Sequence, residues 1–407
     1  MTDGLGLFDN SRGDLDHDDE DYEDERPRRQ RPKRRKRKAT FWVFAAVVVL
    51  IIGGGAYYGL TEILGFGSYD DYTGSGEADV VIEVTSGQGT ADIGATLKDK
   101  GVVASARAFT VAGEDDAKVK GIQPGYYAMK TKMSGKAAVA RILEKKYRVG
   151  QLQIKAGTQL DDITQPDKKV TPGIFTLIAD AAAVTIDGKQ AGPTVEQLRK
   201  AAETADLKTL GVASWAIPDA SKAEPKRRLE GLITPGVTDI MPGQSAEDTL
   251  KTVLTNSAST MDGWGMPKLA DNTGYTPYQV LVMGSLIERE GIAKDFGKIS
   301  EVTYRRLAEG TKLGYDSTIN YVLDAPVITT NGAARNAPGP YNTYLNTGLP
   351  PTPIAAPSSD AVNAAAKPEP GNWRFFVKCQ KDGTSCFAEN AQQHQANVNK
   401  ARADGVF

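Results

Sequence analysis

The chain has 407 residues, 49 basic and 51 acidic side chains, a formal net charge of -2, and only two histidines and two cysteines. This length allows two or three domains of about 150 residues, and its 40% hydrophobic and 25% charged residues are ordinary for a globular protein. The shortage of histidine and cysteine leaves mainly carboxyl groups for catalysis. The chain also lacks a P-loop and a dinucleotide-binding glycine pattern, so we expect no cofactor and no metal.

The first 38 residues carry opposite charges in two blocks. Residues 14–25 are almost all acidic, and residues 26–38 are almost all basic. Blocks of like charge usually remain solvated, so residues 1–38 are predicted to be a disordered tail. A nucleic-acid role for the basic block is an alternative, but a role in membrane orientation or in binding anionic lipids is favoured. We therefore expect no nucleic-acid partner.

An uncharged apolar run follows the basic block directly. Residues 41–60 have the roughly 20-residue length that crosses a bilayer, and a basic cluster on one side keeps that side in the cytoplasm. The alternative is a cleaved signal peptide, which the length of the run and the lack of a cleavage site disfavour. Residues 39–62 are thus predicted to be a single transmembrane helix of a cell-membrane protein, with the N-terminus cytoplasmic and the bulk outside.

After a short polar stretch, the sequence takes on the composition of a folded domain. Residues 63–78 are rich in Gly, Ser, Asp and Tyr and are predicted to be a linker. Residues 79–146 are predicted to form a small αβ module, in which residue spacing indicates two strands and three helices. The strands are expected at 80–84 and 125–129, and the helices at 90–100, 104–111 and 134–145.

Two further regions complete the chain. In residues 147–228, a connecting region, a strand is expected from Tyr147 through Val149, Leu152 and Ile154, and a capping box at 194–197 starts a helix. Residues 213–228 hold prolines and charges and are expected to be an exposed connection. Residues 229–407 contain expected helices at 276–290, 299–307 and 390–402. Short strands and helices without βαβ regularity predict an α+β fold.

The two cysteines bracket a turn signal. Cys379 and Cys386 flank residues 380–385, which include an Asp-Gly pair typical of a hairpin. A disulfide across this hairpin suits an oxidising compartment, while two facing free thiols remain the alternative. A metal site is disfavoured because one cysteine pair without a nearby histidine cannot supply four ligands.

Residues 276–290 form the most informative helix. Thr276, Pro277 and Gln279 are typical of a capped helix start. At about 100° per residue, Glu288 shares a face with Gly284 and Ser285, away from the main apolar stripe. Small neighbours would leave room for a ligand, and an acid beside an apolar wall keeps its proton and can donate it. The alternative is an ordinary surface carboxylate.

Glu290 projects toward the packing side of the same helix. It is interpreted as a structural acid, or as an ion-pair partner of Arg305 or Arg306.

Residues 284–290 resemble the signature of the YceG-like family, the endolytic murein transglycosylases. Further similar elements follow the family order over residues 80 to about 400. They are residues 229–235 (Glu-Gly-x-x-x-Pro), residues 302–307, the set Leu313, Asp316, Thr318 and Tyr321, residues 340–344 with 348–351, residues 375–377, and His394.

The resemblance implies a membrane-anchored lytic transglycosylase with Glu288 as its catalytic residue. It implies a LysM-like module at 79–146 and a YceG-like catalytic domain at 229–407. The implied reaction cleaves the MurNAc-GlcNAc β-1,4 bond of nascent peptidoglycan and leaves 1,6-anhydro-MurNAc ends. Implied partners are peptidoglycan glycan strands and peptidoglycan synthases such as penicillin-binding proteins.

The matched motifs also suggest roles for other polar residues. The expected substrate contacts are Ser285, Asp316, Tyr321, Asn342 and Tyr344. The alternative is that the two tyrosines pack in the core and that Asn342 shapes a turn. Structural support is expected from Glu230, Glu290 and Arg306.

The chain departs from the family pattern at several positions. Arg305 stands where the family often has Asn, residues 314–315 where it often has Gln, and Ser385 or Cys386 where it often has His. Gln395 replaces the usual Asn, and residues 178–225 are longer than the minimal pattern, which indicates an insertion. Two other functions stay open: a non-catalytic wall-binding scaffold, and a hydrolase that releases reducing ends.

Overall fold

The structure is a computed structural model that describes residues 68–165, 167–323 and 332–406. The predicted tail (1–38), the predicted transmembrane helix (39–62) and the start of the predicted linker lie outside these residues. Tyr69–Phe407 form one compact unit. Within the described ranges, no helix has both the length and the apolar character needed to span a bilayer.

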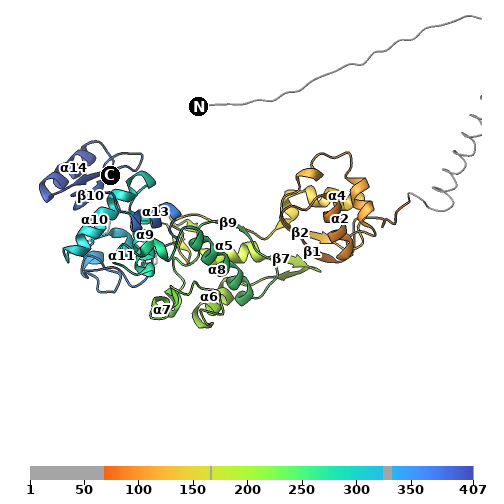
Figure 1. Ribbon diagram of the computed structural model, residues 1–407, viewed down its shortest axis with the longest axis horizontal. Helices are drawn as coiled ribbons and strands as arrows, with labels where there is room; N and C mark the ends of the chain where they lie inside the picture. Colours follow the sequence, from red (N-terminus) through yellow and green to blue (C-terminus); the bar gives the residue numbers. More distant parts are fainter. Residues whose placement is uncertain (1–67, 166, 324–331, 407) are drawn as a thin grey trace, which may run out of the picture. The chain divides into compact units, whose positions relative to one another are not determined.

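Residues 69–149 form a small module around a three-stranded antiparallel sheet (Figure 1). The sheet order is β1 (Asp79–Val84), β2 (Gly125–Lys130), β3 (Arg148–Val149), and its helices are α2 (Thr90–Asp99), α3 (Ala106–Ala112) and α4 (Gly135–Leu143). Alternate residues of β2 are buried, as expected for a strand with one covered face. Its core includes Ile82, Leu97, Phe109, Met129 and Ile142.

The predicted linker does not extend to residue 78. Asp71 accepts a hydrogen bond from the Gly135 amide (2.9 Å) at the start of α4. The Ser105 hydroxyl donates to the Asp70 carbonyl (2.7 Å), and Ser75 forms a β-bridge with Met133. Residues from about 70 onward therefore belong to the module, because their backbone groups and the Asp71 side chain form hydrogen bonds with it.

The single strand expected from Tyr147 to Ile154 is instead two strands in different sheets. β3 pairs with β2, whereas β4 (Gln151–Ile154) pairs with β9 (Gly236–Asp239). Gly150 separates them with a φ of 77°, and a Cβ there would lie 2.2 Å from the Ile240 carbonyl oxygen. Glycine alone accommodates this turn and close approach.

The remaining elements are mostly helical, with small two-stranded sheets β4-β9, β5-β6, β7-β8 and β10-β11. The mixed α+β class expected from the sequence is confirmed. In chain order they are β5 (Ile163–Thr164), β6 (Val170–Thr171), α5 (Ile174–Ala182), β7 (Val184–Ile186), β8 (Lys189–Ala191), α6 (Val195–Thr204), α7 (Ile217–Ala220), α8 (Ala246–Gly263), α9 (Pro277–Glu290), α10 (Phe296–Ala308), α11 (Asp316–Asn320), α12 (Gly332–Asn336), α13 (Ser359–Ala366), β10 (Phe375–Lys378), β11 (Ser385–Ala388) and α14 (Ala391–Ala403).

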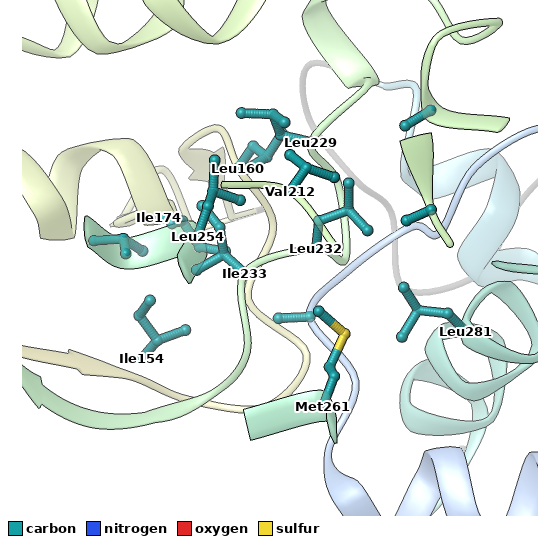
Figure 2. Packing of buried hydrophobic residues seen from close by; sticks show 14 of the residues in the cluster. Ile154, Leu160, Ile174, Val212, Leu229, Leu232, Ile233, Leu254, Met261 and Leu281 are labelled. Carbon is teal, nitrogen blue, oxygen red and sulfur yellow. The ribbon is translucent and has the colours of Figure 1, made fainter. Parts of the chain in front are cut away.

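One hydrophobic core joins residues on both sides of position 228. Figure 2 shows Leu160 and Ile174 beside Ile233 and Leu254, which belong to the same buried cluster. The segment 213–228, expected to be an exposed connection, forms α7 and contributes the fully buried Ala216 and Ala220. The connecting region and the residues after 229 therefore fold around a shared core.

The C-terminal hairpin carries the two cysteines. β10 and β11 pair with Val377 opposite Cys386, and Cys379 and Cys386 are joined in a disulfide of 2.01 Å. The Phe375 ring of β10 stacks on His394 of α14 with ring centroids 5.2 Å apart, so the last helix is fixed to this hairpin.

Candidate active site

Helix α9 carries the predicted acid at its C-terminal end. Thr276 accepts from the Gln279 amide (3.2 Å), while the Gln279 side chain accepts from the Thr276 amide (2.9 Å). These reciprocal bonds satisfy amides that lack helical partners. From Val280 to Ile287 every residue is buried, so the middle of the helix is enclosed by the core and only its first and last turns reach solvent.

Helix α13 covers the face of α9 that was expected to stay open. A Cβ on Gly284 would lie 3.1 Å from Val362 Cγ2 and 3.3 Å from Val362 Cα. Ser285 is fully buried, and its hydroxyl donates to the Val282 carbonyl (2.7 Å) and accepts from the Ile354 amide (3.0 Å). Gly284 therefore permits close helix packing, and the expected substrate contact by Ser285 is not supported.

Glu288 is half-buried just beyond this packed face. Its Oε2 accepts two hydrogen bonds from Ser358, one from the amide (3.0 Å) and one from the hydroxyl (2.5 Å). Ser358 is the N-cap of α13, and its hydroxyl also accepts from the Ala361 amide (3.2 Å). The surroundings of this carboxyl oxygen are thus two polar donors at a helix N-terminus, not the apolar wall expected from the helical spacing.

A loop before β5 flanks the same end of α9. Arg289 donates to the Gly157 carbonyl (3.2 Å), and Gly157 in turn donates to the Ala356 carbonyl (2.8 Å). A Cβ on Gly157 would lie 4.0 Å from Glu288 Cγ. Two chain segments far apart in sequence, around residues 157 and 358, therefore meet beside Glu288.

Glu290 does not pair with either arginine. Its Oε1 accepts from the Ser317 amide (3.3 Å) at the start of α11. Arg305 instead bonds Glu301 (2.8 Å), and Arg306 donates to the carbonyls of Arg374 and Leu313. Burial raises the pKa of Glu290, and nearby Asp316 adds to the effect. Glu290 fixes α11 to α9, while Arg306 fixes α10 to the start of β10.

Asp316 and Tyr344 lie together. The Tyr344 hydroxyl donates to Asp316 Oδ1 (2.6 Å), and Arg335 bonds both oxygens of Asp316 (3.2 and 3.3 Å). Burial and Asp316 raise the pKa of Tyr344, so the phenol remains protonated and donates. Both side chains stay partly exposed, which leaves this cluster accessible to a polar ligand.

Asn342 shapes a turn. Its amide nitrogen donates to the carbonyls of Arg335 (3.0 Å) and Ala337 (2.7 Å), and its side-chain oxygen accepts from the Tyr344 amide (2.9 Å). The side chain is 6% exposed. Every polar atom is used within the protein, so its expected substrate contact is replaced by the turn-forming alternative.

Tyr321 belongs to a buried cluster with Glu230. Its hydroxyl donates to Glu230 Oε2 (3.1 Å), which also accepts from the Leu160 amide (3.3 Å). The Tyr321 ring lies 5.0 Å from that of Tyr341, with the Arg227 guanidinium 4.5 Å above it. Tyr321 thus follows the core-packing alternative, and its expected substrate contact is not supported. Burial raises the pKa of Glu230 to about 8.

Ser358 and Arg335 are the site residues that sequence reasoning missed. Ser358 precedes Asp360, Ala361, Val362 and Ala365, the pattern of a capped short helix. That pattern could have predicted the cap, but not its contact with Glu288. Arg335 carries no comparable signal, since its pairing with Asp316 depends on the tertiary fold.

The described residues contain no group of three or more His, Cys, Asp or Glu side chains placed to hold a metal ion. What remains is one half-buried carboxyl group, held by one of its oxygens. Such a carboxyl can give a proton to a bound group and take one back.

Comparisons with known proteins match most of this chain. The model of the YceG-like family matches residues 82–400. The endolytic murein transglycosylase of Bacillus subtilis is 26% identical over 360 residues, covering 87% of this chain and 90% of the relative. That of Streptococcus pneumoniae (strain D39) is 25% identical over 370 residues, covering 86% of this chain and 63% of the relative.

A crystal structure shares the fold. A protein from Listeria monocytogenes described as YceG-like matches with a TM-score of 0.50 and 22% sequence identity, covering 78% of this chain and 98% of that protein.

Proposed function

This chain belongs to the YceG-like family, and on that premise we propose that it is a lytic transglycosylase with Glu288 as its catalytic residue. Its substrate would be the β-1,4 bond between MurNAc and GlcNAc within peptidoglycan strands. The observation that carries the proposal is the half-buried Glu288 carboxyl, anchored on one oxygen at the end of a helix whose middle is enclosed by the core. The relatives named endolytic murein transglycosylases support the substrate class.

A single carboxyl group suffices for this reaction. Glycoside hydrolysis generally takes two carboxylates, one as the acid and one as the base or nucleophile. Here Glu290, the other acid in the last turn of α9, is directed to the Ser317 amide. A reaction in which the substrate supplies its own nucleophile therefore fits this site better than hydrolysis by a carboxylate pair.

Glu288 acts first as an acid and then as a base. It protonates the glycosidic oxygen while the bond from that oxygen to C1 of MurNAc breaks. The C6 hydroxyl of the same sugar attacks C1 and gives its proton to the Glu288 carboxylate. The products are a free GlcNAc 4-hydroxyl and a 1,6-anhydro ring, so no water is consumed and the enzyme regains its proton.

Asp316 and Tyr344 are the predicted contact residues that remain candidates for holding sugar. Both side chains are partly exposed. A hydrogen bond joins them, so polar atoms from α11 and from the loop at residue 344 lie together. A carboxylate and a phenol suit the hydroxyl and N-acetyl groups of the substrate.

The remaining parts would place this chemistry at the cell membrane. The apolar run at 41–60, within the predicted helix 39–62, and its preceding basic block support a single-pass anchor with a cytoplasmic N-terminus. The module at 79–146 fits the slot of a LysM-like unit that orients or holds glycan. A membrane-proximal cut in nascent strands would limit their length, and it implies action beside peptidoglycan synthases, including penicillin-binding proteins.

Mass analysis of digested peptidoglycan tests the proposal. The purified full-length protein and its Glu288→Gln variant are incubated with peptidoglycan or with nascent uncrosslinked strands. The parent is expected to release anhydro-ended fragments, and Glu288→Gln to release none because its amide cannot transfer the proton. Hydrated reducing ends would identify a hydrolase instead. Glycan binding by a folded parent without any cleavage would identify a wall-binding scaffold.

A further inference from the structure

The two oxygens of Glu288 have different environments. Oε2 accepts from both the amide and the hydroxyl of Ser358, at 3.0 and 2.5 Å. Among the residues that the structure describes, none donates a hydrogen bond to Oε1. The carboxyl group is therefore held from one side only.

Ser358 is itself held in place by the helix that it caps. Its hydroxyl accepts from the Ala361 amide (3.2 Å), so its own hydrogen is free to point to Glu288. Helix α13 lies against α9 through the contact of Val362 with Gly284. The position of Ser358 relative to Glu288 thus depends on the packing of two helices in the core and not on a mobile side chain.

This asymmetry determines which oxygen carries the proton. An oxygen that accepts from an N–H and an O–H has no favourable direction left for a hydrogen of its own. The negative charge of the carboxylate is also favoured next to these donors at the N-terminus of α13. The transferable proton therefore belongs on Oε1.

We propose that Ser358 is a positioning residue that fixes Oε2 of Glu288, so that Oε1 gives the proton to the glycosidic oxygen and later takes the proton of the C6 hydroxyl. This inference rests on the proposed function. The proton leaves Oε1 as the C1–oxygen bond breaks, and it is replaced as the O6–C1 bond forms. Between these steps, the Ser358 hydroxyl and amide stabilise the carboxylate.

Ser358→Gly is the sharpest variant. It removes the hydroxyl but keeps the amide donor, and glycine at an N-cap weakens a helix far less than alanine does. Ser358→Thr keeps the hydroxyl. Ser245→Gly is the matched control, because Ser245 caps α8 by accepting from the Asp248 amide (3.2 Å) and donates to the Asp248 carboxylate (2.6 Å). The charged side chains on the elements around Glu288, such as Lys155, Arg289, Glu290 and Asp360, stay unchanged.

The measurements are the kcat, KM and pH–rate profile of anhydro-end formation by the full-length protein. For Ser358→Gly we expect kcat to fall roughly tenfold with KM unchanged, since the residue orients Glu288 and touches no substrate. Losing a donor to the carboxylate disfavours its charged form relative to the parent, so the alkaline limb of the pH–rate profile should move to higher pH. Ser358→Thr should restore both properties, and Ser245→Gly should alter neither.

A parent-like pH–rate profile and kcat for Ser358→Gly would overturn the inference and leave a capping role only. A second readout separates this failure from failure of the proposed function. The full-length protein is prepared with 13C-labelled glutamate carboxyls for NMR. The signal that is missing in Glu288→Gln is assigned to Glu288, and its chemical shift is followed against pH. If the parent makes no anhydro ends, a higher titration midpoint in Ser358→Gly still supports the contact with Oε2. An unchanged midpoint rejects it.

Discussion

Glu230 shows how one buried acid makes stability depend on pH. It is 2% exposed, its Oε2 accepts from Tyr321 and Leu160, and its Oε1 has no partner within the described ranges. Burial raises its pKa from 4.5 to about 8. Between those values the folded protein holds this proton more tightly than the unfolded chain, so the contribution of Glu230 to stability falls as pH rises.

Glu230→Gln should therefore flatten the pH dependence of stability. The amide stays neutral, and its oxygen can still accept from Leu160 and Tyr321. Between pH 5.5 and 8, the parent should lose at least about 1 kcal/mol more of its free energy of unfolding than the variant does. Urea unfolding at both pH values measures this difference. Glu247→Gln, at an exposed position on α8, should behave as the parent. Equal losses in parent and Glu230→Gln would contradict the prediction.

Single residues were predictable where their role is local. The caps at Thr276 and Thr194 follow from side chains that bond amides three residues away. Ser285, Tyr321 and Asn342 were expected to contact substrate, with core packing as the alternative for Tyr321 and a turn for Asn342, because motif and spacing give residue type but not what covers a face. Their hydroxyl and amide groups are used inside the fold. The contact of Ser358 with Glu288 spans 70 positions, which no local pattern reveals.

At the scale of elements, the pair α9 and α13 decides the geometry of the site. A helix whose residues are buried around its whole circumference needs neighbours on every side, and α13 is one of them. The absence of a side chain at Gly284 sets how closely Val362 approaches. That approach in turn brings the N-cap of α13 to Glu288.

Gly284→Ala should disturb this packing. Its Cβ would lie 3.1 to 3.4 Å from three atoms of Val362, two of them backbone, and overpacking typically costs about 1–3 kcal/mol. Alanine's better helix propensity returns up to about 1 kcal/mol, so we expect a net loss of roughly 1 kcal/mol. The rate of anhydro-end formation should also fall, as α13 moves away from α9. Denaturant unfolding and the digestion assay measure the two effects.

Gly263→Ala is the matched control, since Gly263 ends α8 and a Cβ there meets nothing within 4 Å. It should be neutral or slightly stabilising and keep full activity. If Gly284→Ala behaved like this control, close approach of α13 would not be needed at that position.

At the scale of the whole described chain, hydrophobic clusters and sequence motifs divide the protein differently. The sequence motifs begin at residue 229, but the larger core combines Leu152 and Leu198 with Leu254 and Leu281. Hydrophobic periodicity marks which residues are buried, yet it does not say which segments share a core. The module was predictable because its core is local, within residues 82–142.

These separate cores predict separate unfolding of the module and the rest. Leu97 and Leu254 are both essentially buried, in the cluster of the module and in the largest cluster respectively, and Leu→Ala in a core costs about 2–5 kcal/mol. The tryptophans of the described chain, at 215, 264 and 373, all lie outside the module. Leu97→Ala should therefore leave the tryptophan fluorescence transition unchanged and shift part of the circular dichroism transition. Leu254→Ala should shift the fluorescence transition itself. A fluorescence shift of equal size in both variants would mean that the two cores unfold as one cooperative unit.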